Sequence, residues 1–257
     1  MKKVCQVLFS TNRFPYLTRT LEAQKKLVDF EGIELFKLMI DDYPLNRDNG
    51  YVIEYAQKYG FNEIILHEEN MGITSTWEQF FNYVKDKDFD YIFHHEDDVE
   101  PTKPIRILDM IEILENDKNL YQVQLKRNNW YLHENEEFSV KETDIKYKNF
   151  YYETQANFFN MLFAVYPAWI AKENFREDLG CCPSEGMISH LLNKKYGMQG
   201  AYLKDSDGMF LVNHFGETTR GKRVNEGEPG WEHFGSNVFD PSKLYNSRTG
   251  REVSTID

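Results

Sequence analysis

The first hundred residues alternate between short apolar runs and longer amphipathic stretches, and this alternation limits the possible folds more than any other feature of the sequence. The apolar runs have the length and composition of buried strands, and they lie at 4–9, 33–40, 63–67 and 89–94. The stretches between them predict helices at 10–27, 47–59 and 70–86. Strands that alternate with helices in this way predict an α/β fold with a mostly parallel central sheet flanked by helices.

The remainder of the chain is less regular. The sequence predicts helices at 104–116 and 184–197 and strands at 120–125, 158–166, 200–203 and 208–215, whereas residues 127–153 match neither pattern. Residues 216–257 contain many glycine, proline, threonine and serine residues and predict a C-terminal loop and tail. Because no linker of domain length interrupts the chain, we expect a single domain over residues 1–257, divided into parts at 1–100, 101–215 and 216–257.

Composition and charge exclude several classes of protein. Hydrophobic residues make up 41% and charged residues 28% of the 257 residues, which is typical of a globular protein. The formal net charge of −12 disfavours nucleic acid as a partner, with one local exception in the basic segment 220–223. Cys5, Cys181 and Cys182 do not form a disulfide framework, and we expect reduced thiols. The sequence shows no signal peptide and no apolar run of about 18 residues, so we expect a cytoplasmic protein.

The segment YIFHHEDDVEP, residues 91–101, places several acids directly after an apolar strand. Carboxylates this close repel one another and raise each other's pKa values, which a divalent cation would offset. Glu96 and Asp98 have one residue between them, so a strand would direct both toward the same side. Hard cations such as Mg²⁺ and Mn²⁺ prefer such oxygen ligands. The alternative is a solvated charged turn, but the strand is apolar on both faces and is therefore expected to be central in the sheet.

Polar residues also follow the other predicted strands of the first half. Because parallel strands end at the same edge of a sheet, these residues are expected to meet near the acidic turn, at the edge where α/β proteins bind ligands. They are Ser10, Thr11 and Arg13 after the first strand, Asp41 and Asp42 after the second, and Asn70 and Gly72 after the third. The histidines before the acids receive no catalytic role: we expect His94 to face the core, whereas His95 could reach the site.

The order of these features resembles the GT-A glycosyltransferases, most closely the family 2 type, over roughly residues 4–215. Glu96-Asp97-Asp98 looks like the EDD form of the family's DxD motif. The resemblance implies a Rossmann-like GT-A fold with a nucleotide-sugar-binding half at 1–100 and an acceptor half at 101–215. It further implies metal-dependent transfer of a sugar from a nucleotide-diphosphate sugar, with a UDP-sugar as the expected donor, and inversion is expected. Mn²⁺ or Mg²⁺ would be the cofactor.

The resemblance also implies roles for individual residues. Asp98, Glu96 and His214 would bind the metal, and Glu96 and Asp97 would contact the ribose or the donor sugar. The other implied donor contacts are Ser10, Thr11, Arg13, Asp41, Asp42, Asn70 and Gly72. Structural alternatives remain open: the aspartate pair could form a turn before Pro44, Asn70 and Gly72 could be only a helix entry, Arg13 could pair with a surface acid, and His214 could be a structural hydrogen-bonding residue.

The general base of an inverting transferase takes a proton from the acceptor hydroxyl. In the resembling families it stands at the start of a late helix, a place that Glu185 occupies here. Gly186 stands where the family usually has a second acid, so Asp178 is the other candidate. Glu185 could instead be only an acid favoured by the positive end of the helix dipole.

Two further segments bear on the substrates. Arg220, Lys222 and Arg223 lie on a glycine-containing loop after His214 and could neutralise a departing diphosphate. Trp130, Tyr131 and Trp231 could stack on an acceptor, which the sequence leaves open between a glycan, a protein, a lipid-linked sugar and a modified nucleobase.

The alternative functions are a non-catalytic sugar- or nucleotide-binding module and another metal-dependent nucleotidyl or phosphate enzyme, although no P-loop is present.

Overall fold

The computed structural model describes residues 1–11, 14–42, 50–69, 71–127, 140–147, 150–155, 162–173, 185–205 and 209–214. These residues form one nine-stranded sheet in the order β4-β3-β1-β5-β11-β8-β12-β10-β9. Its strands are β1 (Lys2–Ser10), β3 (Ile33–Asp41), β4 (Glu63–Leu66), β5 (Tyr91–Glu96), β8 (Leu120–Leu125), β9 (Val140–Tyr147), β10 (Phe150–Gln155), β11 (Phe163–Pro167) and β12 (Gln199–Asp205). The helices are α1 (Phe14–Leu27), α2 (Gly50–Lys58), α3 (Ile73–Val84), α4 (Ile107–Asn116), α6 (Ala168–Lys172) and α8 (Glu185–Tyr196).

Two small two-stranded sheets accompany the large one in the described part of the chain. β2 (Val28–Asp29) pairs in parallel with β7 (Ile105–Arg106), and β6 (Val99–Pro101) pairs antiparallel with β13 (Val212–His214). The second pair brings residues more than a hundred positions apart in sequence next to one another, directly after the acidic turn.

The large sheet is mostly parallel, as predicted. β4, β3, β1 and β5 run side by side in one direction, so their carboxyl ends lie at one edge. β11 is antiparallel to both β5 and β8, and β10 is antiparallel to both β12 and β9. Since β12 is parallel to β8, seven of the nine described strands share one direction and only β10 and β11 oppose it.

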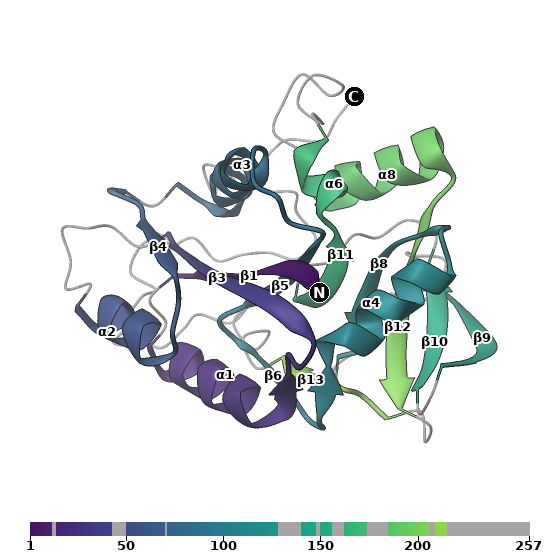
Figure 1. The fold of residues 1–257 in the computed structure, drawn as a ribbon, viewed down its shortest axis with the longest axis horizontal. Coiled ribbons are helices and arrows are strands. Elements are labelled where there is room, and N and C mark those ends of the chain that lie inside the picture. Colours follow the sequence, from purple (N-terminus) through teal and green to yellow (C-terminus); the bar gives the residue numbers. More distant parts are fainter. Residues whose placement is uncertain are drawn as a thin grey trace, which may run out of the picture.

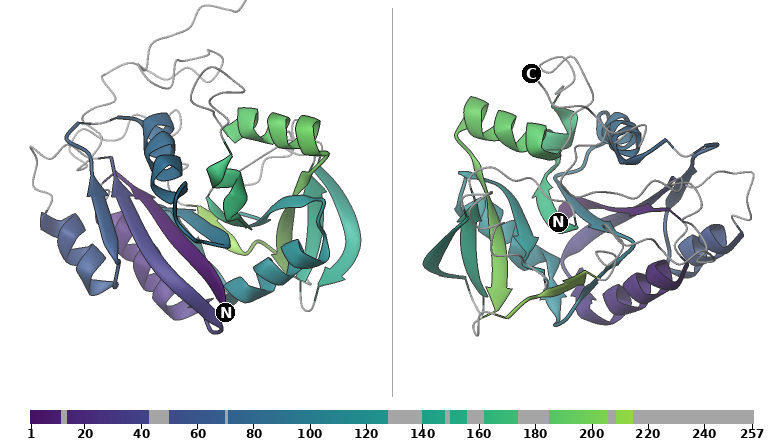
Figure 2. Two further views of the ribbon diagram at one scale, coloured as in Figure 1. Left: turned by 45° about the horizontal axis from the view of Figure 1, so that its top comes forward. Right: turned by 180° about the vertical axis from the view of Figure 1, so that it is seen from behind.

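Helices cover both faces of the sheet (Figures 1 and 2). On one face, apolar side chains of α3, α6 and α8 share a core cluster with Cys5, Val7 and Phe9, alternate residues of β1. On the other face, side chains of α1 and α2 share a cluster with Leu8, and side chains of α4 share one with Val4. The side chains of a strand alternate between the two faces, so a strand that is apolar at every position fits only between two helical layers.

The predicted helices and strands of the first hundred residues are confirmed, with boundaries that shift by a few residues. The central position of the strand before the acidic turn is confirmed as well, because β5 lies between β1 and β11. β9 and β10 were not predicted, since they fall in the segment 127–153 that the sequence left unassigned. Within the described ranges, none of the helices is long and apolar enough to cross a membrane.

Candidate metal and nucleotide-sugar site

The acidic turn follows β5 at the carboxyl edge of the sheet. Glu96 is the last residue of β5, and Asp98 lies in the turn that leads into β6. β13 pairs with β6 so that His214 stands opposite Val99, the neighbour of Asp98 in the chain. The short β6–β13 pair therefore delivers a histidine from the end of the described chain to the acids that follow β5.

Glu96, Asp98 and His214 form the one cluster of acids, histidines or cysteines within the described ranges that could hold a metal ion. One ligand atom from each lies within 4.8 Å of the others, and His214 Nε2 is 3.5 Å from Asp98 Oδ1. Ligands on opposite sides of a Mg²⁺-sized ion are separated by about 4.2 Å, so a small closure would suffice. Two carboxylates and an imidazole are a suitable donor set for Mn²⁺ or Mg²⁺. Asp98 and His214 are more than nine-tenths buried, so a charge here needs compensation.

Asp97, between these two acids, contacts the protein itself. One carboxylate oxygen accepts a hydrogen bond from the Thr11 backbone N–H at 3.2 Å, and its carbonyl accepts one from Thr20 Oγ1 at 2.8 Å. These bonds hold the acidic turn against the end of β1 and against α1. Ser10 precedes Thr11 and is buried, and its backbone carbonyl accepts a hydrogen bond from the Asp42 N–H at 2.8 Å.

Asp42 organises the segment that leads into α3. Its Oδ1 accepts hydrogen bonds from His67 Nδ1 and from the Met71 backbone N–H, both at 2.6 Å, and its Oδ2 accepts the Gly72 N–H at 2.7 Å. The His67 Nε2 contacts Gln79 Oε1. The carboxylate thus joins the ends of β3 and β4 to the first residues before α3.

The electrostatic environment favours a charged His67. Burial alone lowers the pKa of His67, but the hydrogen bonds to Asp42 and Gln79 and the charges of Asp42 and Asp41 together outweigh burial and raise the pKa above its ordinary value. Both ring nitrogens face an oxygen atom, which fits an imidazolium that donates two hydrogen bonds. No local signal in the sequence indicates the partnership of His67 with Asp42, because the two residues follow different strands.

Gly72 caps α3 with φ 77° and ψ 161°. A side chain is strongly disfavoured in that region of backbone space, so glycine is required here for the backbone to turn from β4 into the helix. Asp41, the other member of the predicted acidic pair, is fully buried at the end of β3. Hydrogen bonds and the conformation of Gly72 therefore fix the backbone of the segment around Asp42 and Gly72, beside the acidic turn.

The two histidines of β5 point to opposite faces and neither is exposed. His94 packs among the rings of Phe9, Trp77 and Phe80, as expected for a core residue. The ring nitrogens of His95 lie 2.9 and 2.7 Å from the side-chain amide nitrogens of Gln6 and Gln24. The expectation that His95 could reach the site is wrong, because alternation along β5 turns it toward α1, and burial lowers its pKa to about 3.

Several predicted site residues lie outside the described residues. Glu185 is the first residue of α8, but its side chain is not among those described. The others outside the described ranges are Arg13, Asn70, Asp178, Arg220, Lys222, Arg223, Trp130, Tyr131 and Trp231. The structure thus brings together Ser10, Thr11, Asp41, Asp42, Gly72 and the acidic turn with His214 at one edge of the sheet.

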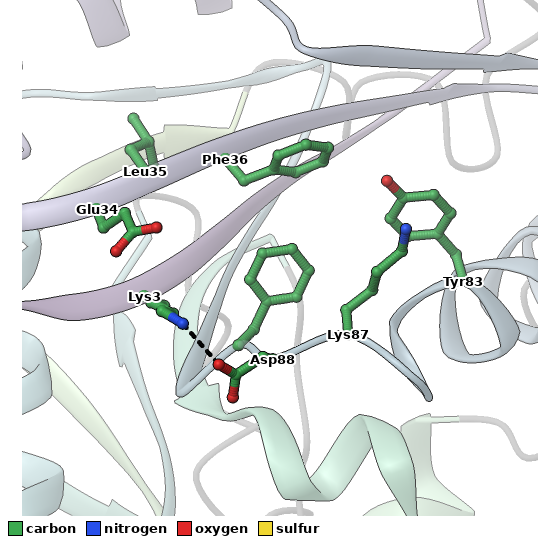
Figure 3. A pocket seen from close by; sticks show the side chains of 8 residues that line it. Lys3, Glu34, Leu35, Phe36, Tyr83, Lys87 and Asp88 are labelled. Carbon is green, nitrogen blue, oxygen red and sulfur yellow. Dashed lines mark hydrogen bonds and ion pairs between the residues drawn. The ribbon is translucent and has the colours of Figure 1, made fainter.

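A surface pocket of about 330 Å³ lies elsewhere, at the amino-terminal ends of β1 and β3 (Figure 3). Phe36 and Tyr83 line it, and Lys3 and Asp88 form an ion pair at its rim. Because the acidic turn is at the carboxyl ends of the same strands, this pocket is not part of the candidate site.

No protein-family model matches the sequence, and a search of curated proteins finds no match. Solved structures do match the fold. A structure of GalNAc-T7 with UDP, GalNAc and Mn²⁺ aligns with a TM-score of 0.54 and 12% identity, over 83% of this chain and 44% of that chain. The mannosyltransferase PcManGT from Pyrobaculum calidifontis, in complex with GDP-Man and Mn²⁺, aligns with a TM-score of 0.53 and 13% identity, over 80% of this chain and 55% of that one. The chain therefore spans about half the length of these proteins, and the likeness shows that it has the GT-A fold.

Proposed function

We propose that this chain is a metal-dependent glycosyltransferase that moves a sugar from a nucleotide-diphosphate sugar to an acceptor hydroxyl. The observation that carries the proposal is the group of Glu96, Asp98 and His214 at the carboxyl edge of the central strand of a GT-A fold. Both solved structures of similar fold contain Mn²⁺ and a nucleotide or nucleotide sugar, which supports Mn²⁺ as the cofactor.

Glu96, Asp98 and His214 would hold the cation, with Glu96-Asp97-Asp98 in the place of a DxD motif. The cation would supply positive charge to the diphosphate that leaves with the donor. Carboxylates that are close together repel each other, and a cation between them offsets that repulsion. Asp98 is the principal ligand in the proposal, as the family resemblance implies, and its Oδ1 lies 3.5 Å from His214 Nε2.

The donor would lie across the ends of β1, β3 and β5. We assign the donor contacts to Ser10, Thr11, Arg13, Asp41, Asp42, Asn70, Gly72, Glu96 and Asp97, of which Arg13 and Asn70 lie outside the described residues. A UDP-sugar is proposed as the donor from the family resemblance. A GDP-sugar is the other candidate, because a structure of similar fold is in complex with GDP-Man. The bonds that Asp42 makes to Met71 and Gly72 would fix the backbone that faces the donor sugar.

Transfer also needs a base for the acceptor hydroxyl and positive charge to neutralise the leaving diphosphate. We assign the base to Glu185 at the start of α8, with Asp178 as the second candidate. Inversion follows if the acceptor oxygen, as either carboxylate takes its proton, attacks the anomeric carbon from the side opposite the bond to the leaving diphosphate. Arg220, Lys222 and Arg223 would neutralise the diphosphate, and Trp130, Tyr131 and Trp231 would contact the acceptor. Residues 1–100 would then bind the donor and 101–215 the acceptor within a single domain, with 216–257 as the C-terminal loop and tail.

The test is a thermal-shift panel of UDP- and GDP-sugars, each with and without Mn²⁺. We expect one donor to raise the melting temperature only when Mn²⁺ is present, because the metal and the diphosphate bind together. Asp98→Ala should abolish this shift, whereas Asp117→Ala, at an exposed turn where Asp117 accepts one backbone hydrogen bond, should retain it. A folded protein that responds to no donor with Mn²⁺ would refute the proposed function.

A further inference from the structure

Glu100 lies in β6, two residues after Asp98, but it does not belong to the metal-ligand group. Its Oε2 accepts a hydrogen bond from Arg19 Nε at 2.8 Å, and its Oε1 accepts one from Asn213 Nδ2 at 2.8 Å and one from Arg19 Nη2. Both oxygens are thus engaged by cations or amides of the protein. A bidentate arginine–carboxylate pair of this kind is strong and fixes the relative orientation of the two side chains.

These bonds connect three separate elements beside the metal group. Arg19 belongs to α1, Glu100 to β6 and Asn213 to β13. Glu100 and Asn213 stand directly opposite each other in the strand pair, and His214 stands opposite Val99. Because side chains alternate, Glu100 and Asn213 project on one side of the pair and His214 on the other.

The β6–β13 pair needs such an anchor because it is only three residue pairs long. An isolated two-stranded unit is at best marginally stable in water. Thr102 supports one end of the pair, where its N–H bonds to Leu211 and its hydroxyl to Phe210. The Arg19–Glu100–Asn213 contact holds the middle residue pair, next to His214.

We propose that Glu100, held by Arg19, is a positioning residue that keeps His214 in place as a metal ligand by binding Asn213. The inference rests on the proposed function, because it presupposes that Glu96, Asp98 and His214 bind a cation.

The test is the affinity for Mn²⁺ alone, measured by the loss of the free-ion EPR signal on titration. Glu100→Ala should weaken Mn²⁺ binding by about tenfold, the lower end of what loss of an outer partner of a metal ligand costs. Asn213→Ala, a milder change, should weaken it in the same direction. Glu173→Ala is the matched control, since Glu173 also accepts side-chain hydrogen bonds from two residues, Lys195 and Tyr196, but away from this strand pair.

A double-mutant cycle separates positioning from simple loss of negative charge near a cation. If Glu100 acts through His214, Glu100→Ala should change the Mn²⁺ affinity of the His214→Ala variant by less than about twofold. A direct effect of charge would persist at full size in that background and would overturn the inference. So would an unchanged Mn²⁺ affinity in both Glu100→Ala and Asn213→Ala.

The same titration distinguishes this inference from the function on which it rests. If the wild-type protein binds no Mn²⁺, the metal centre and the inference fail together. If the wild type binds Mn²⁺ and loses it in Asp98→Ala but not in Glu100→Ala, the metal centre stands and only the positioning role fails. Urea unfolding of each variant shows that the comparison is made on folded protein.

Discussion

Replacing Asp42 by alanine should destabilise the protein by about 3 kcal/mol, chiefly through His67. A hydrogen bond to a charged group contributes about 1.5–3 kcal/mol. Met71 and Gly72 are partly exposed, so water can replace the carboxylate at their N–H groups and the loss there is about 0.5 kcal/mol each. His67 is only 6% exposed and would lose its charged partner in the interior, at a cost of about 2 kcal/mol.

The destabilisation caused by Asp42→Ala depends on pH, and the pKa of His67 sets the direction of that dependence. The raised pKa of His67 means that the folded state binds its proton more tightly than the unfolded state, whose pKa is near 6.5. The stabilisation by Asp42 is therefore fully present below about pH 6.5 and is lost as pH rises through the folded-state value. The cost of Asp42→Ala should be larger at pH 6 than at pH 9.

Equilibrium urea unfolding at these two pH values measures both effects. With an m-value of about 3 kcal/mol/M, the midpoint at pH 6 should fall by about 1 M. Asp117→Ala is the matched control, because Asp117 accepts a single bond from the Asn119 N–H at an exposed turn and should cost under about 1 kcal/mol at both pH values. A cost for Asp42→Ala that is below about 1 kcal/mol, or that is equal at pH 6 and pH 9, would refute the reasoning.

Three other predictions follow from packing, backbone and chemistry. Phe80→Ala should cost about 3–5 kcal/mol in urea unfolding, because Phe80 is fully buried against the rings of Phe9 and His94 and leaves a cavity; an equal value for exposed Ile53→Ala would contradict this. Gly72→Ala should cost about 1–3 kcal/mol from its φ of 77° alone, and a neutral result would show that the segment before α3 readjusts. Glu185→Gln should leave the Mn²⁺-dependent donor shift intact and slow donor hydrolysis, with water as acceptor, by at least about 100-fold; full activity would transfer the base role to Asp178.

Much of the fold could be predicted because its physical cause is local. An apolar run such as Tyr91-Ile92-Phe93 indicates a strand that is covered on both faces, and Ile92 and Phe93 of β5 are fully buried. The border strand β9 could not be predicted because such a strand needs no continuous apolar run: Ile145 of β9 remains 47% exposed. β9 pairs with β10 and β10 with β12, and no short sequence pattern records these pairings.

The site was predictable in outline and not in its internal contacts. The spacing of Glu96 and Asp98 indicates a shared side, but the proximity of His214 depends on the pairing of β6 with β13, which no short sequence pattern records. For the same reason the sequence could not assign Glu100 to Arg19 and Asn213. Long-range pairs of this kind follow from topology, and the family resemblance alone suggested His214.

The acids at the strand ends divide into two groups by their contacts. Asp97 accepts a hydrogen bond from the Thr11 N–H, and Asp42 accepts hydrogen bonds from the Met71 and Gly72 N–H groups, so these carboxylates hold the ends of the strands together. Glu96 and Asp98 flank Asp97, and one ligand atom of each lies within 4.8 Å of one from His214. Glu96 ends β5, whereas Asp97 and Asp98 lie in the turn after it, so the turn rather than strand alternation sets where these carboxylates point. Of the three acids in EDD, the middle one is held by the protein, and the outer two are those to which the proposed function assigns the cation.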